Sequence, residues 1–487
     1  MTAQWNNPRD VGERIYIQGR LKLDTPTHLG CGDAEGLLDM SLMRDEYSGG
    51  ILLTGSSLAG ALRGYLINLG EYTDLAKKLF GDVTKDKSLE SRLIIEDAIS
   101  EDPGLEIRDG VAISGASGTA LDRAKYDMEL LSAGSTFKIG FELLVPKEGG
   151  EEYIRTLVIA LKGLELGEIS LGKRKRRGFG RCSVSGWKVT RFSMGTPAEL
   201  VRWLQAWPLD DLSNEKPNID QLLLGKELAP IHPTSVLTIK AVFSLDSPIM
   251  IRSTPEVEWD GQNKKVAEAP DMVHLHSRRK NGLRPVVSGT SLAGVLRSRA
   301  VRICNLLGVD AEDYVGGMFG SRKPETVKKP KEPSEESATS PKKKQDWHAS
   351  RLWIDETELT GPMEADQVQS RVMIDRFTGG AHSGALFSEQ PVYPLDGSQM
   401  TINMKLAPVV KKGEIGLLIL LLKDLWTGDL PLGGESGVGR GRLKGISAEI
   451  AYNGNHWTIT SGPEDTLIIS EGRNELEGFL EALKKGE

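Results

Sequence analysis

The 487-residue chain has only three cysteines, few aromatic side chains and no long apolar run. Cys31, Cys182 and Cys304 are far apart and odd in number, which argues against a disulfide framework or a zinc cage of thiolates and favours a reducing cytoplasm. No apolar run approaches the ~18 residues of a membrane-spanning helix, and the first residues lack the basic and apolar regions of a signal peptide. We therefore expect a cytoplasmic protein with no membrane contact.

The chain also lacks an excess of positive charge. Its formal net charge is −7, so the total charge does not indicate nucleic-acid binding. It does not exclude such binding, because phosphate recognition depends on local Arg and Lys side chains and on backbone N–H groups. The length predicts two or three domains, and hydrophobic and charged fractions of 39% and 26% are ordinary for a globular protein.

What is present is an internal repeat. Thr54–Arg63 (TGSSLAGALR) recurs as Ser288–Arg297 (SGTSLAGVLR), with seven of ten positions identical. Five further matches occur in the same order: Leu23–Pro26 with Leu245–Pro248, Phe80–Gly81 with Phe319–Gly320, Ser91–Leu93 with Ser350–Leu352, Asp122–Arg123 with Asp375–Arg376, and Gly178–Arg181 with Gly437–Arg440. Six ordered matches indicate a tandem duplication.

The repeat predicts a first module over residues 1–190, a linker over 191–234 and a second module over 235–487. Residues 321–345 are rich in Lys, Pro, Glu and Ser, so we expect a disordered insertion, with a basic arm on RNA as the less favoured alternative. Each copy shows an early alternating strand, a helix at the repeated motif, more strands and a second helix. This order predicts an α+β fold, with helices on one face of an antiparallel sheet.

The repeated helix start is a candidate anion site. Hydroxyl side chains stand at the expected N-cap region, where free N–H groups and the helix dipole attract phosphate. An ordinary helix cap is the alternative, but the motif occurs twice and an Arg follows each time. The candidate phosphate contacts here are Ser56, Ser57, Arg63, Ser291 and Arg297.

A second basic element lies near the end of each copy. Leu171–Arg181 contains five consecutive cations between glycines, and phosphates would supply their counter-charge. Leu432–Arg442 keeps the glycines with fewer charges. Neither loop opens a convincing βαβ unit, which argues against a dinucleotide site. The candidate phosphate contacts are Lys173, Arg174, Arg176, Arg177, Arg181 and Arg440.

Together these motifs resemble the RAMP superfamily, specifically the backbone subunits of type III CRISPR effectors. The shared order is an early strand, an Asp, the Ser-Gly-x-Ser-Leu-x-Gly-x-Leu-Arg motif and Phe-Gly. A hairpin motif at Arg371–Gly379 and a late Gly-x-Gly-Arg loop complete it, and the first copy fits the hairpin motif more loosely. A fused pair of modules resembles the type III-D branch.

The resemblance implies two RRM-like (ferredoxin-like) modules that stack along a guide RNA beside other CRISPR effector subunits. Each would insert a thumb-like hairpin, with Arg376 and His382 as RNA contacts in the second. It also implies that a loop aspartate in each module cuts paired target single-stranded RNA. The matching residues are Asp39 and Asp271, each in an Asp-Met pair, 16 and 18 residues before Gly55 and Gly289.

Such an aspartate could act as a general base or hold a hydrated Mg²⁺ or another divalent metal, whose ligands the sequence does not assign. Ala59 and Ala293 stand where many relatives carry Lys, and neither copy has the Pro that often follows the aspartate. Three alternatives are a non-catalytic guide-RNA scaffold, a guide-processing endoribonuclease and a small-molecule enzyme with a phosphate loop. The guide-processing alternative would use an early histidine, but His28 has Met250 as its counterpart in the second copy.

Overall fold

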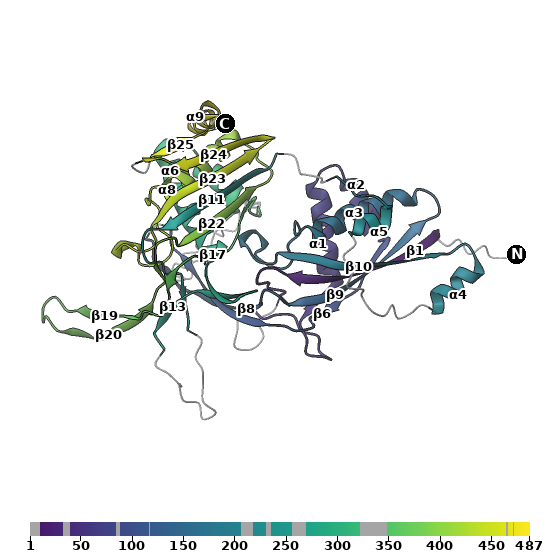
Figure 1. Cartoon of the computed structure of the whole chain (residues 1–487), viewed down its shortest axis with the longest axis horizontal. Helices are drawn as coiled ribbons and strands as arrows, with labels where there is room; N and C mark the ends of the chain where they lie inside the picture. Colours follow the sequence, from purple (N-terminus) through teal and green to yellow (C-terminus); the bar gives the residue numbers. More distant parts are fainter. Residues whose placement is uncertain are drawn as a thin grey trace, which may run out of the picture. The chain divides into compact units, whose positions relative to one another are not determined.

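A computed structural model describes residues 10–32, 39–83, 88–115, 117–205, 218–229, 235–255, 269–321, 348–463, 466–470 and 472–487 (Figure 1). The chain divides into two compact units. Unit 1 comprises Met1–Thr234 and Leu275–Val286, and unit 2 comprises Ser235–His274 and Val287–Glu487. The expected insertion at 321–345 lies outside the described residues, apart from Ser321. Among the described helices, none combines the length and apolar character needed to span a bilayer.

Unit 1 is built on an antiparallel sheet of order β10-β1-β9-β5. Its strands are β1 (Val11–Leu23), β5 (Leu93–Ile95), β9 (Thr136–Pro146) and β10 (Cys182–Ser193). The helices are α1 (Gly55–Asn68), α2 (Thr73–Phe80), α3 (Gly150–Glu165), α4 (Pro197–Gln205) and α5 (Ile219–Leu224). Helices α1, α2, α3 and α5 lie over one face of this sheet (Figure 1). Leu58, Leu62 and Leu66 of α1 are fully buried at i, i+4 and i+8, as the apolar spacing predicts.

A long hairpin leaves the unit 1 sheet. Its strands β7 (Leu105–Ile113) and β8 (Ala120–Leu131) pair only with each other among the described strands, and we call this hairpin the first thumb. Two smaller pairs are β2 (Leu52–Leu53) with β6 (Ala98–Ile99) and β3 (Asp82–Val83) with β4 (Ser88–Leu89). A further hairpin pairs β14 (His276–Arg279) with β15 (Gly282–Val287). Unit 1 therefore contains a hairpin from the second half of the chain.

Unit 2 repeats the plan. Its sheet runs β25-β24-β23-β11-β22, and β16 and β17 both pair with β22. These strands are β11 (Leu237–Leu245), β16 (Leu352–Ile354), β17 (Thr357–Thr360), β22 (Gln399–Leu406), β23 (Leu443–Tyr452), β24 (Asn455–Ser461) and β25 (Leu467–Ile469). The helices are α6 (Gly289–Leu307), α7 (Gly317–Phe319), α8 (Lys412–Trp426) and α9 (Arg473–Lys485), with a π-helical turn at Glu312–Gly316.

The unit 2 counterpart of the first thumb is a projecting hairpin, clearly visible in Figure 1. It consists of β19 (Gln369–Ile374) and β20 (Ala381–Gln390), and we call it the second thumb. Its base joins a four-stranded sheet of order β12-β13-β20-β19, with β12 at Arg252–Ser253 and β13 at Met272–His274. A short pair, β18 (Met363–Glu364) with β21 (Tyr393–Pro394), lies beside the thumb in the chain.

The two units share the order strand, helix, strand, thumb, strand, helix, strand. In both, the first strand lies between the strand that follows the thumb (β9 or β22) and the strand that follows the glycine-rich loop (β10 or β23), and all these pairs are antiparallel. The predicted α+β class is confirmed, and the order is consistent with a ferredoxin-like core. The duplication read from short motifs therefore extends through the whole sheet.

The predicted linker is partly folded. Strand β10 runs to Ser193, and Ile219 and Leu223 of α5 are buried in the unit 1 core. The Arg191 guanidinium also donates to the Leu223 carbonyl at 2.6 Å. The structure thus places residues on both sides of the undescribed 206–217 segment in unit 1, because short amphipathic stretches cover the sheet edge.

The structure corrects one motif pairing. Gly180 and Gly441 adopt φ of +77° and +79°, and a Cβ on either would lie 1.9 Å from a carbonyl oxygen, of Leu171 and Leu432 respectively. Only glycine fits such a position. Arg181 therefore corresponds to Arg442, not to Arg440 as the sequence pairing assumed. The second loop reads Gly-Val-Gly-Arg-Gly-Arg, so the sequence permits either alignment.

The pairing at the thumbs was wrong as well. The tip of the first thumb closes with Ser114 N–H donating to Thr119, and that of the second with Asp375 N–H donating to Gly380, both at 2.9 Å. Asp375 therefore corresponds to Ser114. The Asp122–Arg123 pair lies on the second strand of its thumb, whereas Asp375–Arg376 lies at the tip. Each copy contains an Asp-Arg pair near a turn, so the sequence alone suggested that the two pairs correspond. The strand register shows that they do not.

Candidate nucleic-acid interface

Asp39 lies at the base of the first thumb. Its Oδ2 atom accepts the backbone N–H of Asp127 on β8 at 3.0 Å. The next residue, Met40, forms a parallel bridge with Met128, in which Met40 N–H donates to the Asp127 carbonyl at 3.1 Å. The Asp39 side chain is exposed. The loop is thus tied to the thumb by its backbone, while the carboxylate remains at the surface.

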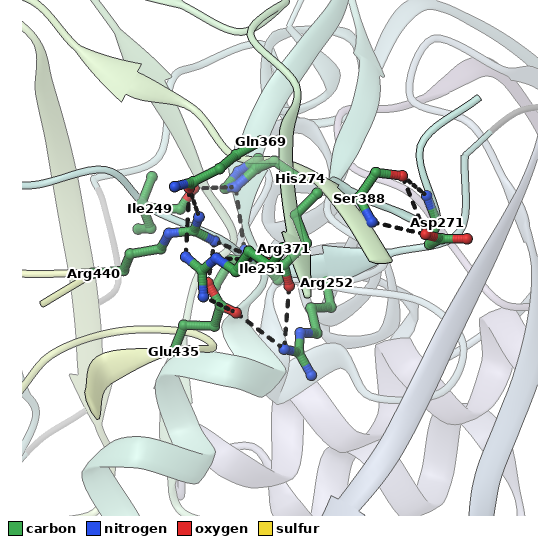
Figure 2. A network of polar contacts seen from close by, with 11 residues as sticks. Ile249, Ile251, Arg252, Asp271, His274, Gln369, Arg371, Ser388, Glu435 and Arg440 are labelled. Carbon is green, nitrogen blue, oxygen red and sulfur yellow. Dashed lines mark hydrogen bonds and ion pairs between the residues drawn. The ribbon is translucent and has the colours of Figure 1, made fainter. Parts of the chain in front are cut away.

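Asp271 occupies the matching place in unit 2. Its Oδ2 atom accepts the backbone N–H of Ser388 on β20 at 2.8 Å and the Ser388 hydroxyl at 3.1 Å (Figure 2). Met272 pairs in parallel with Glu389, as Met40 does with Met128. Asp271 is exposed too. The sequence predicted these two acids as equivalent, and the structure brings each to the same backbone position of its thumb.

The two sites differ in what surrounds the aspartate. In unit 1 the first thumb pairs Asp109 with Asp127, next to Asp39. The pKa of Asp127 is raised, first by burial and then by the neighbouring Asp109 carboxyl. The second thumb has Ser370 and Ser388 at the corresponding positions. The sequence analysis missed this acid pair because it depends on cross-strand register.

We expect Asp127→Asn to stabilise unit 1 at neutral pH. Because the folded-state pKa of Asp127 is raised, its ionisation favours the unfolded state, and folding stability falls as pH rises through the shifted value. The variant lacks this loss, so its advantage should grow as pH rises above about 4, the ordinary aspartate value, and vanish below it. Chemical denaturation of both proteins across this range measures the difference. Parallel pH curves for wild type and variant would contradict the prediction.

The glycine-rich loop of unit 1 is clamped to the loop that follows β1. Lys173 N–H donates to the His28 carbonyl at 3.1 Å, and Gly180 N–H donates to the Pro26 carbonyl at 3.0 Å. Gly434 and Gly441 make the same contacts with Met250 and Pro248 in unit 2, both at 2.8 Å. The five consecutive cations therefore sit on a fixed backbone beside the Asp39 loop.

The predicted cations of this loop have different surroundings. Lys173 and Arg181 are exposed, whereas Arg176 and Arg177 are half-buried in the short 3₁₀ turn Lys175–Arg177. Arg174 has φ of 56°, and its guanidinium lies 4.6 Å from the centroid of the Tyr126 ring on the first thumb. Their role as phosphate contacts stays a prediction. Arg442, the true counterpart of Arg181, is exposed and joins the candidates.

A pocket of about 310 Å³ lies between this loop and the start of α1. Lys173 and Lys175 line one side, and Thr54 and Ser57 line the other. His28 also lines the pocket although its side chain is only 1% exposed. A cation-lined pocket at a helix N-terminus suits an anionic group.

The His28 ring is oriented by one hydrogen bond. Its Nδ1 lies 2.8 Å from the Glu129 carbonyl oxygen, which can only accept, so Nδ1 carries the proton and Nε2 carries a lone pair. Nε2 has no hydrogen-bond partner among the described residues. Burial lowers the pKa of His28 below its usual range, which keeps the ring neutral near pH 7. His28 thus offers the pocket a hydrogen-bond acceptor.

The helix caps differ slightly from the prediction. Thr54 and Ser288 are the N-caps, and their hydroxyls accept the backbone N–H groups of Ser57 and Ser291 at 3.2 Å. Ser56 and Ser57 are exposed in the first turn. The two arginines brace neighbouring segments: Arg63 pairs with Asp82 at 3.3 Å and Arg297 donates to the Gly320 carbonyl at 2.7 Å.

Arg440 lies inside unit 2 rather than at its surface. The residue is 4% exposed, and its guanidinium donates to Glu389 at 3.1 Å and to Gln369 at 2.6 Å, and pairs with Glu435. Arg252 and Arg371 contact the same two glutamates, so the network joins the thumb base to the glycine-rich loop (Figure 2). Burial and the neighbouring Glu389 raise the pKa of Glu435. The contacts of Arg440 in this structure thus stabilise unit 2 and do not present the guanidinium to a ligand.

Unit 1 fills the same place with apolar side chains. Met128 corresponds to Glu389 and Phe179 to Arg440, and both are buried in a small cluster with Leu130 and Met40. The Arg108 guanidinium lies 5.4 Å from the centroid of the Phe179 ring. The duplicated framework thus supports its thumb base with an apolar cluster in one unit and an ionic network in the other.

Both thumbs carry exposed apolar side chains. Phe377 at the second tip is 100% exposed, and Arg376 and His382 are exposed beside it, as expected for RNA contacts. Ile107 and Ile113 are exposed on the first thumb. Exposed apolar side chains on projecting hairpins suit insertion against nucleic-acid bases.

The family comparison decides what this arrangement belongs to. The family model "RAMP superfamily" matches residues 20–183 and 242–444, which together exceed half of the chain. The chain belongs to the RAMP superfamily. The two matched regions coincide with the two copies of the repeat, so the family assignment and the tandem organisation expected from the sequence are confirmed together.

Two curated RAMP relatives show where this chain is similar. The CRISPR system Cms endoribonuclease Csm3 of Methanocaldococcus jannaschii is 29% identical over 195 residues, which cover 34% of this chain and 77% of the relative. The CRISPR system Cmr endoribonuclease Cmr4 of Pyrococcus furiosus is 36% identical over 121 residues, which cover 24% of this chain and 40% of the relative.

Proposed function

We propose that this RAMP protein is a backbone subunit of a type III CRISPR ribonucleoprotein. It binds guide RNA and cleaves the paired target RNA, one cut per module, beside other CRISPR effector subunits. The observation that carries the proposal is that Asp39 and Asp271 are both exposed and both held by the same backbone position of a thumb. Both relatives are named as CRISPR endoribonucleases, which supports an RNA substrate.

Guide RNA would follow the glycine-rich loops and thumbs. Lys173 lines the pocket at the start of α1, and both Lys173 and Arg181 are exposed, so they can contact phosphates directly. The exposed apolar side chains of the thumbs would separate bases and displace a nucleotide at each module. The loops and thumbs would thus contact guide RNA, and the two aspartates would contact the target strand paired with it.

The chemistry follows from that displacement. A duplex in A-form does not align a ribose 2′-OH with its own phosphate for in-line attack, whereas a displaced nucleotide allows it. The aspartate takes the 2′-OH proton, the 2′-oxygen bonds to phosphorus and the bond to O5′ breaks, with O5′ protonated by solvent. Because the thumb N–H binds Oδ2, the Asp39 carboxylate is oriented before substrate arrives.

The described residues do not fit a metal held by protein alone. None of them form a group of three or more His, Cys, Asp or Glu side chains able to bind a metal ion. The expectation of Mg²⁺ or another divalent metal stays a proposal, which comparing cleavage with Mg²⁺ and with a chelator tests directly.

The test of the function is cleavage of labelled target RNA by the assembled complex. We expect two cuts per copy of this subunit, with products that end in a 2′,3′-cyclic phosphate and begin with a 5′-hydroxyl. A target with 2′-deoxy sugars at the two cut positions should bind normally and resist cleavage, since its nucleophile is absent. Cleavage of the deoxy target at those positions would contradict the mechanism.

A further inference from the structure

The hairpin β14–β15 is the most basic short segment of unit 1 after the glycine-rich loop. Residues 275–286 (LHSRRKNGLRPV) contain four cations and no acid, in a chain with net charge −7. The corresponding segment of the first copy, residues 42–53 (LMRDEYSGGILL), has one cation and two acids. The two copies therefore differ in charge at this segment, so the shared fold does not explain the cations of the second copy.

The hairpin is anchored by its inner face. The Glu106 carboxylate of the first thumb accepts the Ser277 hydroxyl at 3.1 Å and the Arg278 backbone N–H at 2.9 Å. Ser277 is fully buried, and Arg108 pairs with the same Glu106 at 3.2 Å. The largely buried Glu106 carboxylate thus anchors the hairpin to the base of the first thumb.

Exposed charge lies on both faces of the hairpin. Arg278 and Lys280 are exposed, and Arg284 is exposed too, although it pairs with Ser277 and so belongs to the same face as that buried hydroxyl. Arg279 donates to the Ser277 hydroxyl at 2.6 Å and helps to hold the hairpin. Leu283, opposite Arg278 in the strand register, is 54% exposed. Cations beside an exposed apolar side chain suit a phosphate backbone with its sugars and bases more than an acidic protein surface.

The anchor lies close to the Asp39 site. Glu106 is three residues from Asp109 along β7, about 10 Å at the usual rise per residue. Asp109 pairs across the thumb with Asp127, whose N–H holds Asp39. Side chains three residues apart point to opposite faces of a strand, so the anchor and the Asp39 site share β7 but use different faces of the first thumb. One RNA strand that runs along the thumb can contact both.

We propose that this hairpin, carried by the second half of the chain, binds the phosphate backbone of the target RNA strand that Asp39 cleaves. The inference rests on the proposed function and adds a target-binding element to its first site. The second copy thus contributes three cations, Arg278, Lys280 and Arg284, to the site of the first copy. Guide RNA and target RNA carry the same phosphodiester backbone, so the experiment measures binding of each strand separately.

The test uses the assembled complex with Arg278→Gln, Lys280→Gln and Arg284→Gln combined. We expect binding of the 2′-deoxy target to weaken roughly tenfold or more at physiological salt, and the slope of log K against log salt to decrease by roughly 2. Binding of guide RNA alone should not change. The Asp39-dependent cut should slow at subsaturating target more than the Asp271-dependent cut.

Two matched variants control for charge and folding. Lys412→Gln, Lys484→Gln and Lys485→Gln together remove three exposed cations from unit 2 and should leave target binding unchanged. Arg278→Lys with Arg284→Lys keeps the charge and should bind as wild type does. Melting temperatures of all variants should agree, because every substituted side chain is exposed.

Several results would overturn the inference. Unchanged target affinity and salt slope in the triple variant would remove the hairpin from the interface, and an equal loss for guide RNA would assign it to the guide strand. Loss of complex assembly with RNA binding intact would indicate an acidic protein partner. In all three cases wild type still cuts, whereas absence of cutting by the wild type would contradict the proposed function itself.

Discussion

Asp39→Asn should abolish one of two neighbouring cuts in target RNA, and Asp271→Asn should abolish the other. A general base contributes roughly 10²- to 10⁴-fold to rate, so we expect losses of at least about 100-fold at each position. Each acid is held by its own thumb, so neither variant should affect the other cut. Both variants should keep RNA affinity, because asparagine preserves the hydrogen bond that Oδ2 accepts. Mapping the product ends on a sequencing gel measures both effects.

Exposed acids near the same sites provide the control. Asp122→Asn on the first thumb and Asp366→Asn near the second remove a carboxylate from exposed positions and should leave both cuts intact. If the double variant of Asp39 and Asp271 cuts as wild type does, the nuclease assignment fails. If only Asp39 matters, the second module serves as a scaffold, and the difference between Asp127 and Ser388 is the first place to seek the cause.

The second large effect concerns stability. Glu389→Ala should destabilise unit 2 by about 3–5 kcal/mol, because it leaves the buried Arg440 to share the single remaining carboxylate, of Glu435, with two other arginines. Arg252 and Arg371 also lose the Glu389 carboxylate, so the thumb base and the glycine-rich loop should loosen together. Chemical denaturation, followed by a probe in unit 2, measures the change in the free energy of unfolding.

Unit 1 provides the design of the control. Glu389→Met with Arg440→Phe places the apolar pair of unit 1, Met128 and Phe179, at the matching positions of unit 2. Replacing a buried ion pair by packed apolar side chains is often neutral, whereas breaking it is costly. We expect the double variant to be at least 2 kcal/mol more stable than Glu389→Ala, as roughly follows from those costs. Equal losses would show that Arg252 and Arg371 require the carboxylate.

The family, the duplication and the α+β class could be predicted from the sequence because each depends on local pattern. The motif at Thr54 and Ser288 encodes a cap and an apolar helix face within one segment. The glycines at Gly180 and Gly441 mark positions that no other residue can occupy. Such signals need no knowledge of distant contacts. The equivalence of Asp39 and Asp271 could be predicted because the resemblance and the repeat both place an Asp-Met pair before the helix motif of each copy.

Only the tertiary structure decided which residues surround these signals. The sequence alignment of Arg440 with Arg181 was two residues out of register, and backbone φ values assigned Arg442 instead. Arg440 lies buried because Glu389 and Glu435, 51 and 5 residues away in the chain, bind its guanidinium.

The surroundings of the first site also depend on distant contacts. The acid pair beside Asp39 depends on register across the first thumb. The anchoring of the basic hairpin on Glu106 joins residues 171 and 172 positions apart. Contacts of this kind depend on strand pairing and side-chain burial between distant segments, which composition and spacing do not encode.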